Sequence, residues 1–366
     1  MTDERSFFTA LEEADPANGQ APPSPQREAV TPNGTGRQRF FTESPGDTKL
    51  RAVDLVAPRR IPPSRGWRAV IYRLSWKSIN LGESPDERYV RALITDITAK
   101  VRNPYTVAVL GGKGGAGKTS MTALVASMFA HIRNDQVVAI DADQAQMANL
   151  AARVNQKANS LREVNTDAAA HKLGRYADMQ DNAGQNEAGL DVVAAVRHVD
   201  SCAPRATGEE FAKAHHHMQN FYTVLFVDCG VDLDHPVMQG VLACADTVLM
   251  VASTGPDGAD GADTNFRWLH TRGYGELLRR AVLVVNHNRD TTSRKDRGTT
   301  TRLIEAMYEH FGQLIPRERI IEMPYDPHIA TAGVVNLDEL RPLVHRRALE
   351  IAAAVARGFT TTTENR

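Results

Sequence analysis

The sequence predicts an α/β fold in which a mostly parallel β-sheet is flanked by helices. Short apolar runs rich in β-branched residues recur along the chain, as expected of strands that are buried on both faces. The first clear run, Tyr105–Leu110, precedes a glycine-rich loop. After the loop, apolar residues recur at helical spacing from Met121 to Phe129. Strand, loop and helix therefore follow one another in the order of a βα unit.

The loop Gly112–Thr119 reads GKGGAGKT and matches the phosphate-binding pattern G-x-x-x-x-G-K-[ST]. Glycines let backbone N–H groups converge on phosphate oxygens, and the following helix adds its positive end. We expect Lys118 to reach the β and γ phosphates and the Thr119 hydroxyl to bind Mg²⁺. The residues predicted to bind ATP here are Gly112, Gly114, Gly115, Ala116, Gly117, Lys118, Thr119 and Ser120.

A second lysine, Lys113, makes this loop resemble the K-G-G-x-G-K-T loop of MinD/ParA-type ATPases. In that family the extra lysine reaches the nucleotide of the partner subunit, so ATP holds two monomers face to face. The resemblance therefore implies a P-loop ATPase fold, an ATP-dependent homodimer, and catalytic roles for Lys113 and Lys118. The alternative is that Lys113 is a solvated residue at a variable loop position.

Two further predicted strands end in carboxylates. Gln136–Ile140 leads into Asp141–Gln146, which resembles the switch I segment of the family, and Tyr222–Val227 leads into Asp228. Carboxylates at the carboxyl ends of parallel strands face the ligand crevice of such a sheet. The resemblance implies that Asp143 positions the attacking water. It also implies that Asp141 and Asp228 support the Mg²⁺, although turn or capping carboxylates are the alternative.

Three more strands are predicted at Asp246–Val251, Ala281–Val285 and Ile320–Pro324. The resemblance places Asn286 against the adenine edge, with an ordinary turn asparagine as the alternative. It places Pro324 in the segment that closes the base pocket. Leu337–Phe359 has helical periodicity and is predicted to be the closing helix.

The chain has 366 residues, and its composition divides it into four parts. Residues 1–65 are polar and rich in Pro, Gly, Ser and Thr, which predicts a disordered tail with one short helix near Phe7 to Ala14. Residues 66–102 are predicted to be a strand and helix extension that packs on the core. Residues 103–360 form the predicted ATPase domain, and residues 361–366 a polar tail.

Within the extension, Trp67–Trp76 carries residues typical of an edge strand. The segment Ser84–Glu87 reads SPDE, a capping box with proline at the first helical position. It predicts the start of a helix whose apolar face lies on the ATPase domain. In the extension and beyond it, several segments resemble the EspI-type branch of the family, which is associated with type VII (ESX) secretion in actinobacteria: Gly66–Arg68, Ile79–Gly82, Gly189–Val192, Trp268–Leu269 and Gly273–Tyr274.

The formal net charge of −1 gives no global attraction to nucleic acid or anionic membranes. The chain has no apolar run of about 20 residues and no amphipathic basic helix at its end, so direct membrane insertion is not expected. Cysteines without metal or disulfide spacing indicate a cytoplasmic location, with recruitment to the inner membrane through a partner as an option. The run His215–His217 is interpreted as a solvated helix face, because adjacent residues on a helix diverge.

Three functions are therefore considered. The first is an ATP-driven dimerisation switch that regulates or positions a secretion apparatus. The second is a ParA-type partitioning ATPase that binds DNA through basic patches, such as Arg267–Arg280 or Arg341–Arg357. Interspersed Glu276 and Glu350 weaken those patches. The third is a structural adaptor that does not hydrolyse ATP, against which the intact Lys118, Thr119, Asp143 and Asp228 argue.

Overall fold

The computed structural model describes residues 61–63, 71–78, 80–143, 149–195, 205–290 and 294–359, with the backbone alone for 294–296. These residues all belong to one compact unit, residues 60–366. Apart from residues 61–63, the predicted tails lie outside the described residues, as do the predicted helix near Phe7 and the segment Gln144 to Gln146. So does Cys202.

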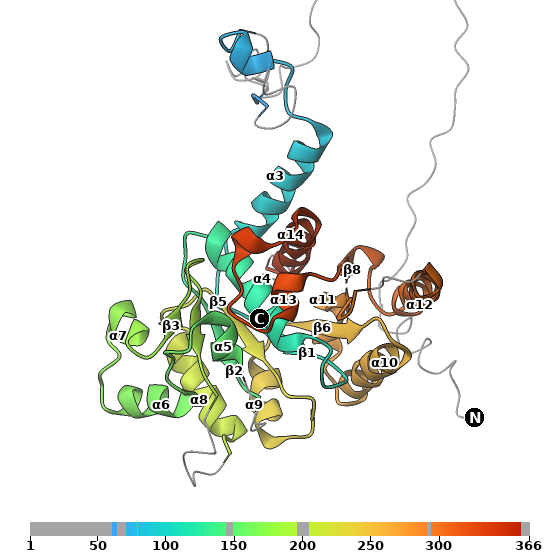
Figure 1. Cartoon of the computed structure of the whole chain (residues 1–366). Helices are drawn as coiled ribbons and strands as arrows, with labels where there is room; N and C mark the ends of the chain where they lie inside the picture. Colours follow the sequence, from blue (N-terminus) through green and yellow to red (C-terminus); the bar gives the residue numbers. More distant parts are fainter. Residues whose placement is uncertain are drawn as a thin grey trace, which may run out of the picture. The chain divides into compact units, whose positions relative to one another are not determined.

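An eight-stranded sheet forms the centre of this unit, in the order β3-β4-β2-β5-β1-β6-β7-β8. All neighbouring strands are parallel except β3 and β4, which are antiparallel. The predicted α/β fold with a mostly parallel sheet is therefore confirmed (Figure 1). The strands are β1 (Tyr105–Leu110), β2 (Val137–Asp141), β3 (Gly184–Gln185), β4 (Asp191–Val193), β5 (Val224–Asp228), β6 (Thr247–Ser253), β7 (Val282–Asn286) and β8 (Ile320–Met323).

Alternate strand residues sort into two separate hydrophobic cores, one on each face of the sheet. In β1, Val107 and Val109 belong to one core while Ala108 and Leu110 belong to the other. The first core is covered by α3 (Pro85–Ile97), α4 (Lys118–Ile132), α5 (Leu150–Val154), α13 (Pro327–Ala330), the 3₁₀ turn η3 (Leu337–Glu339) and α14 (Pro342–Ala356). The second is covered by α6 (Leu161–Ala169), α7 (Tyr176–Gln180), α8 (Gly208–Met218), α9 (Pro236–Cys244), α10 (Pro256–Thr271), α11 (Gly275–Arg280) and α12 (Arg294–Phe311).

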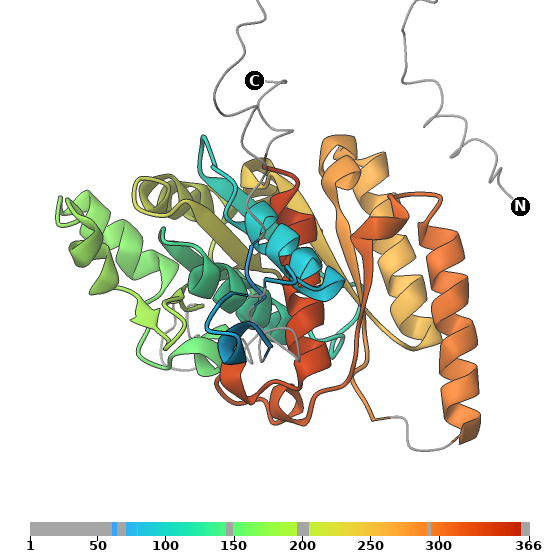
Figure 2. The ribbon, with the colours of Figure 1, turned by 90° about the horizontal axis from the view of Figure 1, so that it is seen from above.

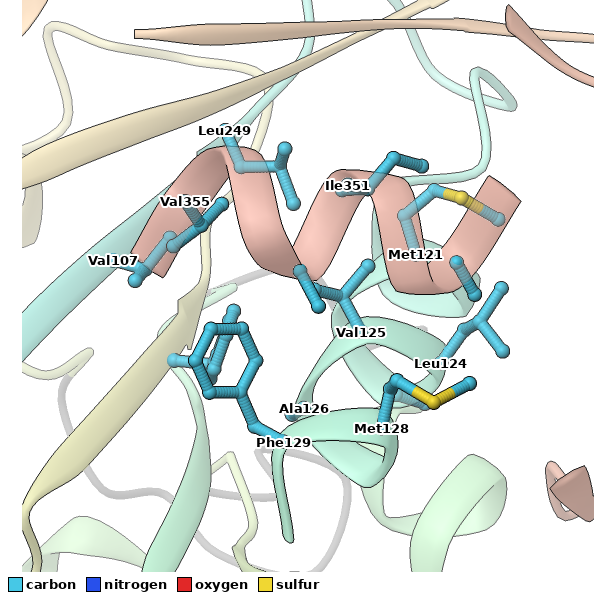
Figure 3. Close-up of a cluster of buried hydrophobic side chains, with 14 of the residues drawn as sticks. Val107, Met121, Leu124, Val125, Ala126, Met128, Phe129, Leu249, Ile351 and Val355 are labelled. Carbon is cyan, nitrogen blue, oxygen red and sulfur yellow. The ribbon is translucent and has the colours of Figure 1, made fainter. Parts of the chain in front are cut away.

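Helix α4 is the most deeply buried helix near the glycine-rich loop. Its side chains pack between α14 and the sheet, where Val125 and Phe129 meet Ile351 and Val355 in one cluster (Figure 3). Because α4 is enclosed by the sheet and α14, its first turn is held at a fixed place relative to the strand ends. The closing helix itself begins at Pro342, since residues 337–339 form a separate 3₁₀ turn.

Helix α3 begins at the predicted capping box: the Ser84 hydroxyl accepts from the Glu87 N–H and the Glu87 carboxylate accepts from the Ser84 N–H. The helix packs against α14 and α4, and the two views agree that it lies beside α14 (Figures 1 and 2). At its carboxyl end, the buried Arg133 donates from one guanidinium nitrogen to the carbonyls of Ile97 (2.6 Å) and Ala99 (3.0 Å). These bonds satisfy carbonyls that a helix end leaves open.

Two sequence expectations are wrong. Residues 71–74 are helical, so the edge strand expected over Trp67–Trp76 does not extend through them. The expected solvated face at His215–His217 fails at His215, which is buried, stacks on Phe211 and bonds the Thr106 hydroxyl at 2.8 Å. Helix α8 turns this one histidine toward the sheet and leaves His216 exposed.

Candidate functional site

The glycine-rich loop leaves β1 and enters α4 at Lys118. Gly117 has a φ of 94° and caps α4, a backbone conformation that side chains disfavour. Gly112 is required for a different reason, because a Cβ there would lie 2.0 Å from the backbone carbon of Gly261 in α10. The loop is thus seated directly against α10, and its N–H groups and the start of α4 are presented together.

A pocket of about 350 Å³ opens over this loop and the start of α4. Of the predicted nucleotide-binding residues, the structure brings Gly115, Gly117, Lys118, Thr119, Ser120, Asn286 and Pro324 to its wall. Gly112, Gly114 and Ala116 belong to the same loop but do not line the pocket. Lys118 is 8% exposed, so its ammonium group is confined to the site rather than spread through solvent.

Lys113 lies outside the pocket and is paired within the chain. Its side chain is 54% exposed, and its ammonium group forms an ion pair with Asp257 in the first turn of α10. The Lys113 contact lowers the pKa of the Asp257 carboxyl. The two lysines of the loop are therefore separated, one facing the pocket and one on the surface.

Asp141 and Asp228 lie at facing positions of β2 and β5, and both are buried. Burial raises the pKa of Asp228 to about 6, against the opposing hydrogen bond from Thr119 and the charge of Lys118. Burial, and next the Asp228 carboxyl, raise the pKa of Asp141 well above its usual range. The oxygens of Asp141 accept from the N–H groups of Asp143 and Leu150, both at 3.1 Å.

These oxygens fit a magnesium ion, which prefers hard ligands from hydroxyl and carboxylate groups. The Thr119 hydroxyl bonds the Asp228 carboxyl, and the Thr122 hydroxyl lies 3.3 Å from the same group. Among the described residues, no group of three or more His, Cys, Asp or Glu side chains is arranged to hold a metal. Magnesium ions in nucleotide sites commonly keep several waters and take one or two carboxylates together with phosphate oxygens.

Asp143 lies apart from this pocket, in a neighbouring hollow of about 240 Å³ beside Gly230, Val231 and Arg205. A Cβ at Gly230 would come 3.0 Å from the Asp143 carboxylate, so glycine at this point lets the carboxylate approach the loop after β5. The structure thus brings Asp143 against the segment that follows Asp228.

Asn286 contacts the loop. Its side-chain amide donates to the carbonyl of Ala116 at 2.8 Å, and it is 7% exposed. The amide of the neighbouring Asn288 lies 3.4 Å from the Gly115 carbonyl. Asn286 therefore ties the end of β7 to the loop as well as lining the pocket.

Sequence reasoning missed several residues of the pocket wall, notably Asn149, Arg153 and His287. Arg153 follows switch I on α5, a helix of five residues whose periodicity is too short to recognise. The imidazole of His287 bonds Glu322 at 2.7 Å and lowers the pKa of that carboxyl. His287 directly follows Asn286, and this adjacency is the one signal that could have indicated it.

Residues 107–334 match the family described as the CobQ/CobB/MinD/ParA nucleotide binding domain. The chain belongs to this family. The CobQ/CobB/MinD/ParA match covers the loop, both strand-end carboxylates, Asn286 and Pro324. The pocket described above is accordingly that of a nucleotide-binding domain.

The chain is also similar to the ESX-1 secretion-associated protein EspI of Mycobacterium tuberculosis (strain ATCC 25618 / H37Rv), with 34% identity over 301 residues. This alignment covers 82% of the chain and 43% of EspI, so the chain spans less than half the length of that relative. Among the described residues, no helix is both long and apolar enough to cross a membrane.

Two solved structures share the fold. A ParA family ATPase from Chlorobium tepidum TLS has a TM-score of 0.53 and 17% identity, over 68% of this chain and 98% of its own. The MinC:MinD cell division protein complex of Aquifex aeolicus has a TM-score of 0.51 and 18% identity, over 68% of this chain and 93% of its own. At these identities the likeness concerns the fold alone.

Proposed function

We propose that this protein is a Mg²⁺-dependent ATPase whose ATP-bound form is a homodimer, and that it serves a type VII (ESX) secretion apparatus. The observation that carries the proposal is that the two lysines of one loop occupy different environments. Lys118 is buried in the pocket, whereas Lys113 is exposed beside it and does not line it. A lysine in that place is accessible to the nucleotide of a second subunit.

In this proposal each residue has one task. The loop N–H groups and Lys118 bind the phosphates, and Thr119, Asp228 and Asp141 hold the ion directly or through water. Bound Mg²⁺ would neutralise charge on the phosphate oxygens. Asp143 orients the attacking water, and its neighbour Gly230 leaves room for the Asp143 carboxylate to approach the segment after β5. Asn286 and Pro324 confine the base.

The secretion role rests on the similarity to EspI, which extends beyond the nucleotide-binding match. The alignment covers 301 residues, whereas the family match is confined to residues 107–334. We place the protein in the cytoplasm and propose that a secretion component recruits it to the inner membrane.

DNA partitioning is the less favoured function, because the arginines of the two candidate patches are neutralised. Arg272 pairs with Asp234, Arg357 with Asp96, and Arg346 with Asp86. Four more arginines of the patches also pair with carboxylates: Arg267, Arg279, Arg280 and Arg347. Among the described residues, Arg341 is the exception. Such a surface offers little charge to phosphate backbones.

Nucleotide binding and assembly test the core of the proposal. Light scattering coupled to gel filtration should show a monomer with ADP and a dimer with ATP and Mg²⁺. Lys118→Ala should weaken ATP binding about tenfold or more in calorimetry, since it removes the charge facing the phosphates. Equal ATP binding by this variant would contradict the assignment of the loop.

Co-purification distinguishes the two cellular roles. Tagged Asp143→Ala protein, arrested with ATP, should retain secretion components from its own cells and should bind random duplex DNA no better than the ADP form. Tight, salt-sensitive DNA binding without secretion components would favour partitioning.

A further inference from the structure

Arg153 is a cation on the pocket wall for which the proposed mechanism has so far no use. It lies on α5 and lines the pocket together with Lys118, Thr119 and Ser120. Its side chain is half-buried, and burial lowers the pKa of its guanidinium group. A desolvated cation of this kind is costly unless something compensates its charge.

The described residues provide little compensation. The Nε of Arg153 is buried without a hydrogen-bond partner, and one terminal nitrogen makes a long contact of 3.4 Å to the Ile329 carbonyl. No ion pair joins Arg153 to a carboxylate in the described part of the chain. An acceptor from outside the chain would satisfy this group.

The pocket wall indicates which part of the nucleotide Arg153 faces. Arg153 lines the pocket together with Thr119, whose hydroxyl bonds the Asp228 carboxyl at the end of β5. The charge of Asp228 acts on the pKa of the guanidinium in the direction opposite to burial. A planar guanidinium matches two phosphate oxygens at once, whereas it has no such match with an adenine ring edge.

Helix α5 connects this cation to switch I. The N–H of Leu150, its first residue, donates to the Asp141 carboxylate at 3.1 Å, and Arg153 stands one turn later. Leu150 and Arg153 are thus about one turn apart on the same helix. We expect a ligand that binds Arg153 to slow the opening of the bond between Leu150 and Asp141.

We propose that Arg153 binds a phosphate of the nucleotide and thereby makes the position of Asp141 depend on nucleotide occupancy. The inference rests on the proposed ATP binding and adds a residue to it. Arg153 has two linked tasks, contact with the ligand and positioning of Asp141 and Asp143 through α5.

The test compares wild type with Arg153→Met, which keeps much of the stem but removes the charge. Displacement of a fluorescent ADP measures the affinities for ATP, ADP and adenosine. ATP and ADP should bind about tenfold more weakly or worse to the variant, because a charge-assisted hydrogen bond is lost. Adenosine, which has no phosphate, should bind to both proteins within about twofold.

Hydrogen exchange of the Leu150 amide reports the positioning task. ADP should slow this exchange in wild type and leave it unchanged in Arg153→Met at saturating ADP. Arg175→Met is the matched control, because Arg175 is 80% exposed, pairs with Asp178 and lies outside the pocket. This control should behave as wild type in both measurements.

The outcomes separate the inference from the proposed function. A wild type that does not bind ATP overturns the proposed function. A wild type that binds ATP, together with an Arg153→Met protein of equal ADP affinity, overturns the inference alone. An equal loss for adenosine and ADP would show a merely structural arginine and would also overturn it. Should Arg153→Met unfold, Arg153→Lys takes its place and should lose part of the ADP affinity while keeping a normal melting temperature.

Discussion

Asp141 and Asp228 face each other across two parallel strands, so two buried carboxyl groups share one edge of the sheet. Only cations and hydrogen-bond donors allow both to ionise there. Thr119, Thr122 and Lys118 provide part of what is needed, yet the pKa of each carboxyl remains raised. A divalent ion at this edge of the sheet would compensate the charge of both carboxylates.

Asp228→Asn should stabilise the nucleotide-free protein. The folded pKa of Asp228 is about 6, above its unfolded value of 3.8, so its stability contribution is fully present below 3.8 and is lost as pH rises through 6. At pH 7.5 the substitution should raise the free energy of unfolding by on the order of 1–3 kcal/mol. A higher melting temperature would show this. The same variant should lose the dependence of ATP binding on Mg²⁺.

The control is the pH dependence of the difference in melting temperature between Asp228→Asn and wild type. Buried His215 acts in the opposite direction, because burial lowers its pKa from 6.5 to about 4 and the folded state loses stability as pH falls through that window. Both proteins contain His215, so its effect cancels. The melting-temperature difference should shrink between pH 7.5 and 4.5, and a constant difference would contradict the assignment to Asp228.

Gly112→Ala should damage the loop, whereas Gly114→Ala should not. A methyl group at Gly112 would overlap the Gly261 backbone, but at Gly114 it meets nothing within 4 Å. Pushing the loop from α10 should lower the melting temperature by several degrees and weaken ATP binding. Gly114→Ala should melt like wild type. Similar melting temperatures for both variants would mean that loop and α10 separate easily.

Lys113→Ala should bind ATP like wild type and fail to dimerise with it. Its ion pair with Asp257 is exposed and contributes little to folding, so the melting temperature should not change. Light scattering with ATP and Mg²⁺ reads the assembly, and calorimetry reads the affinity at a concentration where both proteins are monomeric. A variant that dimerises normally would show that Lys113 is only a solvated loop residue.

Asp143→Ala should keep ATP affinity, because Asp143 does not line the nucleotide pocket. Steady-state turnover should fall more than tenfold, and the ATP-bound dimer should persist longest of all variants. Turnover within about twofold of wild type would contradict the role in water positioning. Such a change corresponds to far less than the roughly 1.4 kcal/mol in activation free energy of a tenfold rate effect.

The strands were predictable because their signal is local. Tyr105–Leu110 is buried at every position and consists of apolar and β-branched residues, so its sequence alone separates it from its surroundings. The capping box at Ser84 is equally local, since both of its bonds span three residues. By contrast, the short β3 depends on pairing with β4 and carries no pattern of its own.

The features that the sequence did not reveal depend on contacts between distant segments. Arg153 faces the pocket because α5 packs against α4 and Arg153 contacts Ile329, which no spacing reveals. His215 is buried because Thr106, 109 residues away, offers it a hydroxyl. The bond from Asn286 to Ala116 joins residues 170 apart. Residues that belong to a sequence motif, such as Lys118 and Thr119, could be predicted. Residues that reach the pocket only through tertiary contacts, such as Arg153, could not.

The folded unit extends beyond both ends of the family match. Residues 107–334 exclude α3, the first two residues of β1 and all of α14, although Leu93, Ile97 and Ile351 belong to the same core as α4. An expression fragment cut at those limits would expose the apolar side of α4 to water. Fragments intended for crystals or binding assays should therefore begin before Ser84 and continue through Phe359.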